Sequence, residues 1–195
     1  MAGRPREFDR DEALSRIQAA FWARGYEGTS MADLVQVTGL ASARLYAAFG
    51  SKEAMFRTAV ERYELLDGGF ADRALAEEPT ARQALERMLR DAVAVYTSPE
   101  PRGCMVVSAA TNCSPDNDAV HDWLEQHRKR RTASITARLR SAVAAGELRP
   151  GTDVQAVGDA FAAVLNGLSV QARDGVPRRR LLALIGPAMT MLANA

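Results

Sequence analysis

A short segment near the N-terminus gathers side chains that could bind a nucleic acid. Ser42, Arg44 and Tyr46 lie close together, and Lys52 directly follows a serine that can cap a helix. Arginine can donate two hydrogen bonds to the edge of a guanine, and a lysine beside the amides of a helix N-terminus is suited to a phosphate. The residue types therefore predict contact with both the bases and the backbone of double-stranded DNA.

Three short helices are expected to position these side chains. Ser30 and Asp33 have the spacing of a capping box, and Gly39 ends the first helix. A second helix is expected over residues 42–48, and Ser51 begins a third. Two short helices joined by a glycine-containing turn are typical of a helix-turn-helix motif, which places its second helix in the major groove. An ordinary corner between two helices has the same spacing, so spacing alone leaves both interpretations open.

Two further features favour DNA. Lys52 and the amides that follow Ser51 form a phosphate site at a helix N-terminus. Upstream, Arg4 and Arg6 belong to a basic arm of the kind that enters an adjacent minor groove. Arg44 is the best candidate for base specificity, and the alternative for it is a solvated arginine on a short helix.

The residues from Ala20 to Phe56 resemble the DNA-binding domain of TetR/AcrR-family transcriptional regulators. The segment from Leu45 to Glu53, LYAAFGSKE, is its most specific part, and the upstream GYEGTS agrees with it. Further along, the segment RGCM at residues 102–105 resembles the start of the sixth helix in a large subset of the family.

The resemblance implies a role for each matching position. It implies phosphate contacts from Tyr46 and Lys52, base-edge contacts from Ser42, Ala43 and Arg44, and contacts with the DNA backbone from Thr29, Ser30 and Met31. One position departs from the family pattern. Ala41 stands where a serine is common, so the cap of the second helix is expected to be lost or shifted to Ser42.

The whole chain is expected to be all-α. Apolar residues recur at helical spacing from end to end, and strand-like alternation is nearly absent. About nine helices are predicted, over residues 10–24, 31–38, 42–48, 52–66, 80–97, 103–112, 118–145, 154–173 and 177–193. Pro187 should kink the last helix or end it early. We expect a DNA-binding domain over residues 1–56, with the basic arm at 1–8, and an effector-binding and dimerisation domain over 57–195.

The last two helices carry two wide apolar stripes. One stripe must pack within the chain, and a second suggests a further interface. In the resembled family these helices form the four-helix bundle of a homodimer, whose two-fold symmetry matches a palindromic operator. The residues expected at the interface are Val157, Phe161, Val164, Leu168, Leu184 and Ile185. Packing within one chain alone is the other interpretation of these stripes.

The helices between the two ends carry large or polar-tipped side chains. The resembled family uses this region to bind a small-molecule effector, and the candidate pocket residues are Met88, Tyr96, Cys104, Met105, Trp123 and His127. Methionine and aromatic residues also fill gaps in any helical core, so each of these side chains has core packing as its alternative.

Cys104 and Cys113 are the only cysteines. A regulator that senses a metal or the redox state through them is the alternative function, but their spacing matches no known metal signature. Buried structural cysteine is the simpler interpretation, and so few cysteines fit a reducing cytoplasm. The formal net charge is only +1, so any DNA contact must come from a local basic surface. The basic runs at 128–131 and 178–180 are expected to be solvated.

The sequence argues against other classes of protein. It contains no glycine-rich phosphate loop, no metalloprotease motif and no nucleophile-elbow motif, which argues against an enzyme. We expect no metal, cofactor, signal peptide or membrane span. The sequence thus predicts a cytoplasmic homodimeric repressor that a small molecule releases from its operator, and the sign of regulation stays open.

Overall fold

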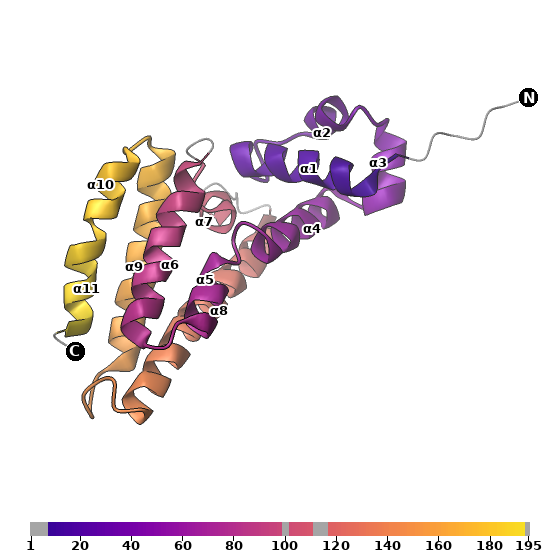
Figure 1. The fold of residues 1–195 in the computed structure, drawn as a ribbon. Coiled ribbons are helices and arrows are strands. Elements are labelled where there is room, and N and C mark those ends of the chain that lie inside the picture. The colour runs from indigo at the N-terminus through magenta and orange to yellow at the C-terminus, as the bar shows by residue number, and fades with distance from the viewer. Residues whose placement is uncertain (1–7, 99–101, 111–116, 194–195) are drawn as a thin grey trace, which may run out of the picture.

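The computed structural model describes residues 8–98, 102–110 and 117–193, and all the regular elements in these ranges are helices (Figure 1). They are α1 (Arg10–Arg24), α2 (Met31–Thr38), α3 (Ser42–Phe49), α4 (Lys52–Leu65), α5 (Phe70–Glu77), α6 (Ala81–Thr97), α7 (Met105–Ala110), α8 (Asp118–Ala144), α9 (Val154–Arg173), α10 (Arg178–Ala183) and α11 (Ile185–Ala193). The predicted all-α class is confirmed. Helices α1–α3 form a lobe set apart from the bundle of α6, α9 and α11, and α4 leads from one to the other.

Local capping explains where the first helices begin. The Asp9 carboxylate accepts hydrogen bonds from the N–H groups of Asp11 and Glu12 and so starts α1. Ser30 and Asp33 form a complete capping box at the start of α2. The Ser51 hydroxyl accepts from the Ala54 N–H at the start of α4. Because these caps use side chains within three residues of the bonds they make, the sequence could specify them without tertiary information.

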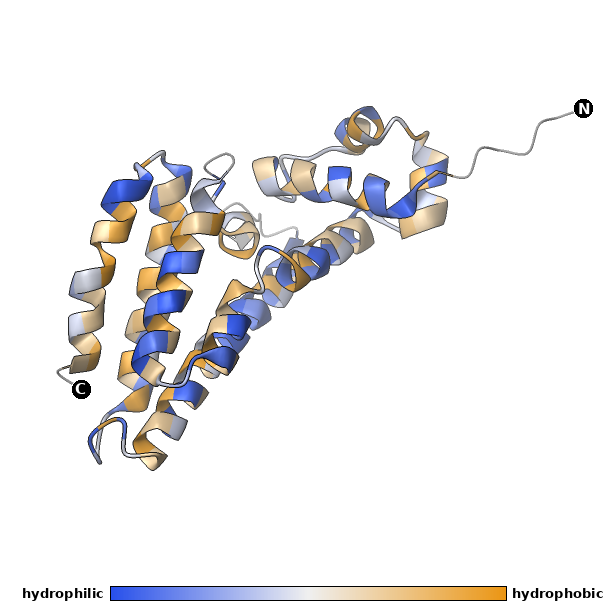
Figure 2. Cartoon of the chain, in the orientation of Figure 1, coloured by the Kyte–Doolittle hydropathy of each residue, from blue (hydrophilic) through white to orange (hydrophobic). Residues whose placement is uncertain are grey.

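Two apolar clusters hold the molecule together. One cluster joins α1–α4 to α7 and the first turns of α8, and the other joins α5, α6, α9, α10 and α11 to the C-terminal half of α8. Figure 2 shows the apolar character of α9 along most of its length and a hydrophilic stripe along α6. The α1–α3 lobe therefore shares its core with two helices of the C-terminal region, α7 and α8.

All nine predicted helices are present, with two additions. The last predicted helix is divided into α10 and α11 at Leu184, three residues before Pro187. A proline clashes with the carbonyl four residues earlier, here that of Ala183, which explains the break that the sequence predicted.

Helix α5 is the second addition, because the sequence did not predict it. Its N-cap residue is Gly69, which has no side chain to make a capping hydrogen bond, so no local sequence signal indicates the start of the helix. Its buried residues are Phe70, Ala71, Ala74 and Leu75, and they pack in the cluster around α6. Tertiary packing, and not a cap, therefore stabilises this short helix.

Candidate nucleic-acid interface and ligand cavity

The turn between α2 and α3 fixes the orientation of α3. Gly39 has φ +70°, the left-handed conformation that ends α2. Leu34 on α2 and Leu45 on α3 are fully buried, and Phe49 at the end of α3 is nearly so. These apolar contacts hold α3 against the lobe by one face and leave the opposite face exposed.

The exposed face of α3 carries the predicted contact residues. Ser42, Ala43 and Tyr46 are exposed, and the Tyr46 side chain keeps 48% of its accessible surface. Arg44 is half-buried, and its guanidinium lies 5.1 Å from the centre of the Phe8 ring. Ala41 makes no capping hydrogen bond, so the cap that a serine would supply is indeed lost. The polar edge that the sequence predicted is available to a partner.

Lys52 lies at the first position of α4. Its ammonium group is 4.5 Å from the centre of the Tyr26 ring, an arrangement that holds the cation in place. Partial burial lowers the pKa of Lys52, while the nearby carboxylates of Glu27 and Asp33 oppose that shift. A positioned lysine at a helix N-terminus, with α3 next to it in sequence, is suited to a backbone phosphate.

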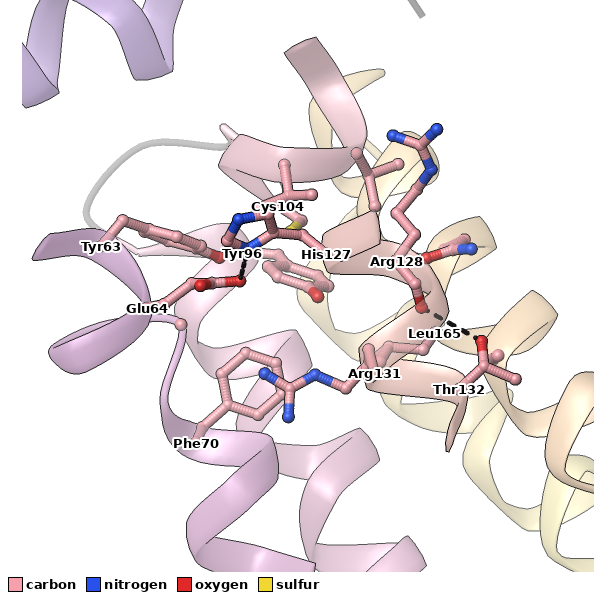
Figure 3. Close-up of a pocket in the computed structure, with 15 residues that line it drawn as sticks. Tyr63, Glu64, Phe70, Tyr96, Cys104, His127, Arg128, Arg131, Thr132 and Leu165 are labelled. Atoms are coloured by element: carbon pink, nitrogen blue, oxygen red, sulfur yellow. Dashed lines mark hydrogen bonds and ion pairs between the residues drawn. The ribbon is translucent and has the colours of Figure 1, made fainter. Parts of the chain in front are cut away.

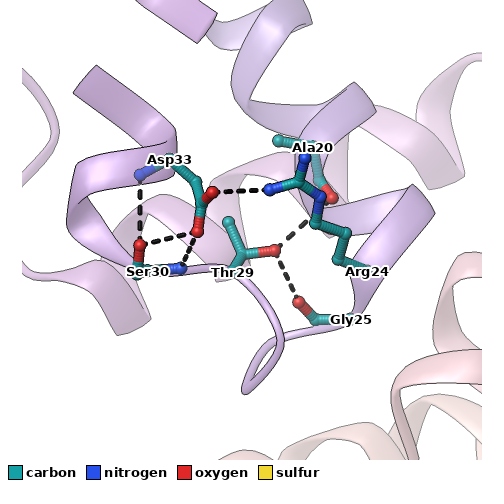
Figure 4. Close-up of polar contacts among 6 residues, drawn as sticks. All are labelled: Ala20, Arg24, Gly25, Thr29, Ser30 and Asp33. Atoms are coloured by element: carbon teal, nitrogen blue, oxygen red, sulfur yellow. Dashed lines mark hydrogen bonds and ion pairs between the residues drawn. The ribbon is translucent and has the colours of Figure 1, made fainter. Parts of the chain in front are cut away.

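Thr29 and Ser30 differ in what they can contact (Figure 4). The prediction that Thr29 touches DNA is wrong, because its side chain is fully buried and its hydroxyl donates to the Gly25 carbonyl over 2.8 Å. Ser30 is exposed, and its hydroxyl is 2.6 Å from the Asp33 carboxylate, which Arg24 approaches to 2.5 Å. Thr29 thus fixes the entry to α2, and Ser30 caps it at the surface.

The other predicted DNA-binding positions are Arg4 and Arg6. Both lie outside the residues that the structure describes, so their contact with a minor groove stays a prediction from the sequence.

A cavity of about 50 Å³ lies between α4 and the C-terminal helices (Figure 3). Three of the predicted pocket residues line it, namely Tyr96, Cys104 and His127. The residues that the sequence analysis missed are Tyr63, Glu64, Gly68, Phe70, Val106, Val107, Arg128, Arg131, Thr132, Ala162, Leu165 and Asn166. The cavity wall is therefore assembled from α4 to α9 and not from a single motif.

The other three predicted pocket residues do not line this cavity. Met88 and Met105 are buried in the two apolar clusters. Trp123 packs on Phe56, with 6.3 Å between ring centres, and on His127, with 4.2 Å. Met88 and Met105 therefore pack in the core and Trp123 lies half-buried beside it. Spacing along a helix does not separate a residue that faces a cavity from one that faces the core.

Two pairs of charged side chains bridge helices at the cavity. His127 Nδ1 is 2.8 Å from the Glu64 carboxylate, which joins α8 to α4. Arg131 of α8 forms an ion pair with Asp72 of α5. These bridges tie three helices together around one cavity, so a ligand that moved one of them would disturb the others.

Two hydrogen bonds join the cavity region to α1 of the N-terminal lobe. The Trp22 indole N–H donates to the Gly103 carbonyl over 2.9 Å, and the next residue, Cys104, lines the cavity. The Arg173 guanidinium at the end of α9 donates to the Ala23 carbonyl over 3.1 Å. Helix α4 adds a third connection, since Lys52 is at its beginning and Tyr63 is near its end.

The predicted interface residues on α9 to α11 fall into two groups. Phe161, Leu168 and Ile185 keep at most 2% of their surface exposed and belong to the core of one chain, so assigning them to a dimer interface is corrected. Val157 and Val164 are half-buried, and Leu184 is 39% exposed. The apolar faces of α9 and α11 that were expected to meet a partner pack on α6 instead. A wide apolar stripe on a helix is typical of a face that packs in the core of its own chain.

Within the described ranges there is no group of three or more His, Cys, Asp or Glu residues that could hold a metal ion, and Cys113 is outside those ranges. No described helix combines the length and the apolar character that crossing a bilayer requires.

An exposed polar edge on α3, a lysine at the start of α4 and a cavity linked to both describe a helix-turn-helix regulator. Family models agree: the one described as bacterial regulatory proteins of the tetR family matches residues 14–59, and one described as the tetracyclin repressor-like C-terminal domain matches residues 79–175. The chain belongs to the TetR family of transcriptional regulators.

Relatives support the same assignment along the whole chain. The HTH-type transcriptional repressor ComR of Escherichia coli is 31% identical over 97% of this chain and 91% of its own length. The E. coli repressor BdcR is 26% identical over 93% of this chain and 87% of its own length. A solved structure of a cysteine mutant of the TetR-family regulator CifR, complexed with a 26-bp operator, has 44% identity and a TM-score of 0.91, and covers 96% of this chain and 98% of that one.

Proposed function

We propose that the chain is a ligand-responsive, homodimeric transcriptional repressor of the bacterial cytoplasm, without catalytic activity. It binds a palindromic operator through α3 of each copy and leaves it when a small molecule enters the cavity. The names of ComR and BdcR support repression, and the operator complex of CifR supports direct binding to a duplex. We place the DNA-binding domain at residues 1–56 and the regulatory domain at 57–195.

The observation that carries the proposal is the position of α4. Its first residue, Lys52, belongs to the candidate DNA surface, and its last turns contribute Tyr63 and Glu64 to the cavity. A helix of this length spans about 20 Å as one rigid unit. A change at the cavity end of α4 therefore changes the position of its DNA end.

The regulation follows from linkage between two states. In one state the two copies hold α3 at a separation that matches successive major grooves. In the other, α4 is displaced and the separation no longer matches. An effector shifts the balance only by its difference in affinity for the two states, and DNA shifts effector affinity by the same factor.

Substitutions on α3 and α4 test the DNA surface. We expect Arg44→Ala to weaken operator binding by about 1–3 kcal/mol per half-site and to relax base specificity. Lys52→Ala should weaken binding to all sequences alike and reduce the salt slope by about one per copy. Fluorescence anisotropy with the intergenic DNA that flanks the gene for this chain, at several salt concentrations, measures both effects.

Matched controls lie on the C-terminal helices. Arg90 pairs with Glu86 on α6, and Lys129 pairs with Glu125 on α8, both at the surface. Arg90→Ala and Lys129→Ala remove the same charges and should leave DNA affinity unchanged. Equal losses in the controls and the α3–α4 variants would overturn the assignment of the DNA surface, as would the absence of any salt-sensitive complex.

The exposed apolar residues of the last helices support a dimer. Val170 is 44% exposed and Leu184 39% exposed, and Gly167 and Gly186 leave open space that a partner helix could approach. We expect Leu184→Glu to shift the protein toward monomer in analytical ultracentrifugation and to lower operator affinity, since one copy contacts one half-site. A variant that remains dimeric at micromolar concentration would argue that the partner binds elsewhere.

A sensor that acts through its cysteines is the second candidate. One observation favours it: Cys104 lines the cavity. Titration of free thiols before and after mild oxidation, followed by DNA-binding measurements, separates this candidate from a sensor of an organic ligand. Loss of DNA binding on oxidation that Cys104→Ser abolishes would favour the cysteine mechanism.

A further inference from the structure

Two tyrosines from different helices face the cavity. Tyr63 of α4 keeps 1% of its surface exposed and Tyr96 of α6 keeps 2%. The Tyr63 hydroxyl is buried without a hydrogen bond of ordinary geometry in the described part of the chain, although the Cys104 thiol and the Met105 backbone lie close enough to influence its pKa. Figure 3 shows it pointing toward the side chains of Tyr96 and His127. A buried hydroxyl without a partner is energetically unfavourable, so this group is well placed to gain a hydrogen bond from a ligand.

Both tyrosines are neutral hydrogen-bond donors. Burial is the first cause that raises the pKa of Tyr63 and of Tyr96 well above the ordinary value, and the neighbouring Cys104 is the next. Neither side chain ionises near neutral pH, so each keeps its O–H group. A phenol O–H in an apolar surrounding favours an oxygen acceptor over a cation, which could not accept its proton.

Two charged pairs close part of the cavity wall. Glu64 pairs with His127 and Arg131 pairs with Asp72, while Arg128 has an interaction partner and keeps one buried guanidinium nitrogen without a hydrogen bond. An ionic ligand would lose its hydration on entering the cavity, and pairing with Glu64 or Arg131 would require it to displace the partner already there. A neutral ligand avoids both costs, and the rest of the wall, including Phe70 and Leu165, suits a small hydrocarbon part.

The size of the cavity limits the ligand further. A volume of about 50 Å³ suits a compact molecule with only a few non-hydrogen atoms. A large planar or lipid-like molecule would first have to separate α4 from α8, which the Glu64–His127 bridge opposes.

From these observations we infer that the cavity binds a small neutral organic molecule through one oxygen atom. A carbonyl, ether or hydroxyl oxygen of the ligand accepts a hydrogen bond from the Tyr63 hydroxyl, with the Tyr96 hydroxyl as a second group beside it, and the apolar wall covers its hydrocarbon part. The role of this molecule as the effector rests on the proposed function, whereas its binding to the cavity does not.

Three probes of similar size and different charge test the inference. Butanone, butyrate and butylammonium are titrated into the full-length protein and followed by protein-observed NMR. We expect butanone to bind at least about ten-fold more tightly than either ion, because neither ion recovers its lost hydration. Tyr63→Phe should weaken butanone binding about 3- to 10-fold, the loss of one hydrogen bond.

A matched control uses another buried hydroxyl. The Thr136 hydroxyl is buried and without a hydrogen-bond partner in the described residues, and it does not line the cavity. Thr136→Val should leave butanone binding unchanged. Tighter binding of butyrate or butylammonium, equal affinity of the Tyr63→Phe variant, or a crystal soaked in butanone with only water at the Tyr63 hydroxyl would each overturn the inference. None of these outcomes involves DNA, so the proposed DNA binding succeeds or fails separately.

Discussion

The DNA-binding surface and the ligand cavity are built in opposite ways. The surface comes from one continuous segment, with Ser42 to Tyr46 on α3 and Lys52 at the start of α4. The cavity comes from residues between Tyr63 and Asn166 on several helices. A surface that only presents side chains to a partner can be specified by a short stretch of sequence. A cavity forms only where helices that are distant in sequence leave space between them.

The two regions should also respond differently to substitution. The side chains on the polar edge of α3, Ser42, Arg44 and Tyr46, are exposed or half-buried, so their removal should change binding and leave the fold intact. Residues around the cavity are buried or half-buried among several helices, so changes there should affect stability first. The following predictions test this difference, in order of the expected effect.

Gly103→Ala should be the most damaging substitution. Gly103 has φ +67°, and a β-carbon there would lie 2.5 Å from the carbonyl oxygen of Ser169. Backbone strain and the clash together should lower the free energy of unfolding by about 4 kcal/mol. Gly175 has φ +79° but open space around it, so Gly175→Ala should cost only about 1 kcal/mol. Urea unfolding measures both, and equal losses would show that the wall at Gly103 is not tightly packed.

Trp22→Phe should have an intermediate effect. The substitution removes the indole N–H that donates to the Gly103 carbonyl and leaves this buried carbonyl without its donor. The free energy of unfolding should fall by about 2 kcal/mol. Because this bond joins α1 to the cavity wall, hydrogen exchange should also increase at the start of α7. Trp123→Phe removes an indole that packs between Phe56 and His127. If both variants changed exchange at α7 equally, the Trp22 bond would not be the specific link.

Ser30→Ala should have the smallest effect on stability. It removes one half of the capping box of α2, a loss of about 1 kcal/mol. In a protein of this size the midpoint of thermal unfolding should fall by about 2–4 °C. Thr152, whose hydroxyl donates to the Arg149 carbonyl at the surface, provides the matched control. A larger fall for Thr152→Ala than for Ser30→Ala would contradict the importance of the capping box.

The sequence predicted helices with side-chain caps closely because their limits depend on neighbouring residues. The predicted limits of α1 and α9 agree with the structure, since Asp9 and Asp153 cap them. Helix α5 was missed because it has no side-chain cap and depends on packing against α6. The burial of Thr29 could not be foreseen for the same reason: a threonine near the start of a helix has no local feature that distinguishes a buried side chain from an exposed one.

By itself the sequence determined most of the helices and the helix-turn-helix with its exposed polar residues on α3, because caps, glycine turns and apolar spacing act over a few residues. Only the tertiary structure decided which apolar stripe belongs to the core, which aromatic side chains face the cavity, and how Trp22 meets Gly103. These features depend on how helices far apart in sequence pack against one another. The spacing of residues along one helix carries no information about where another helix lies.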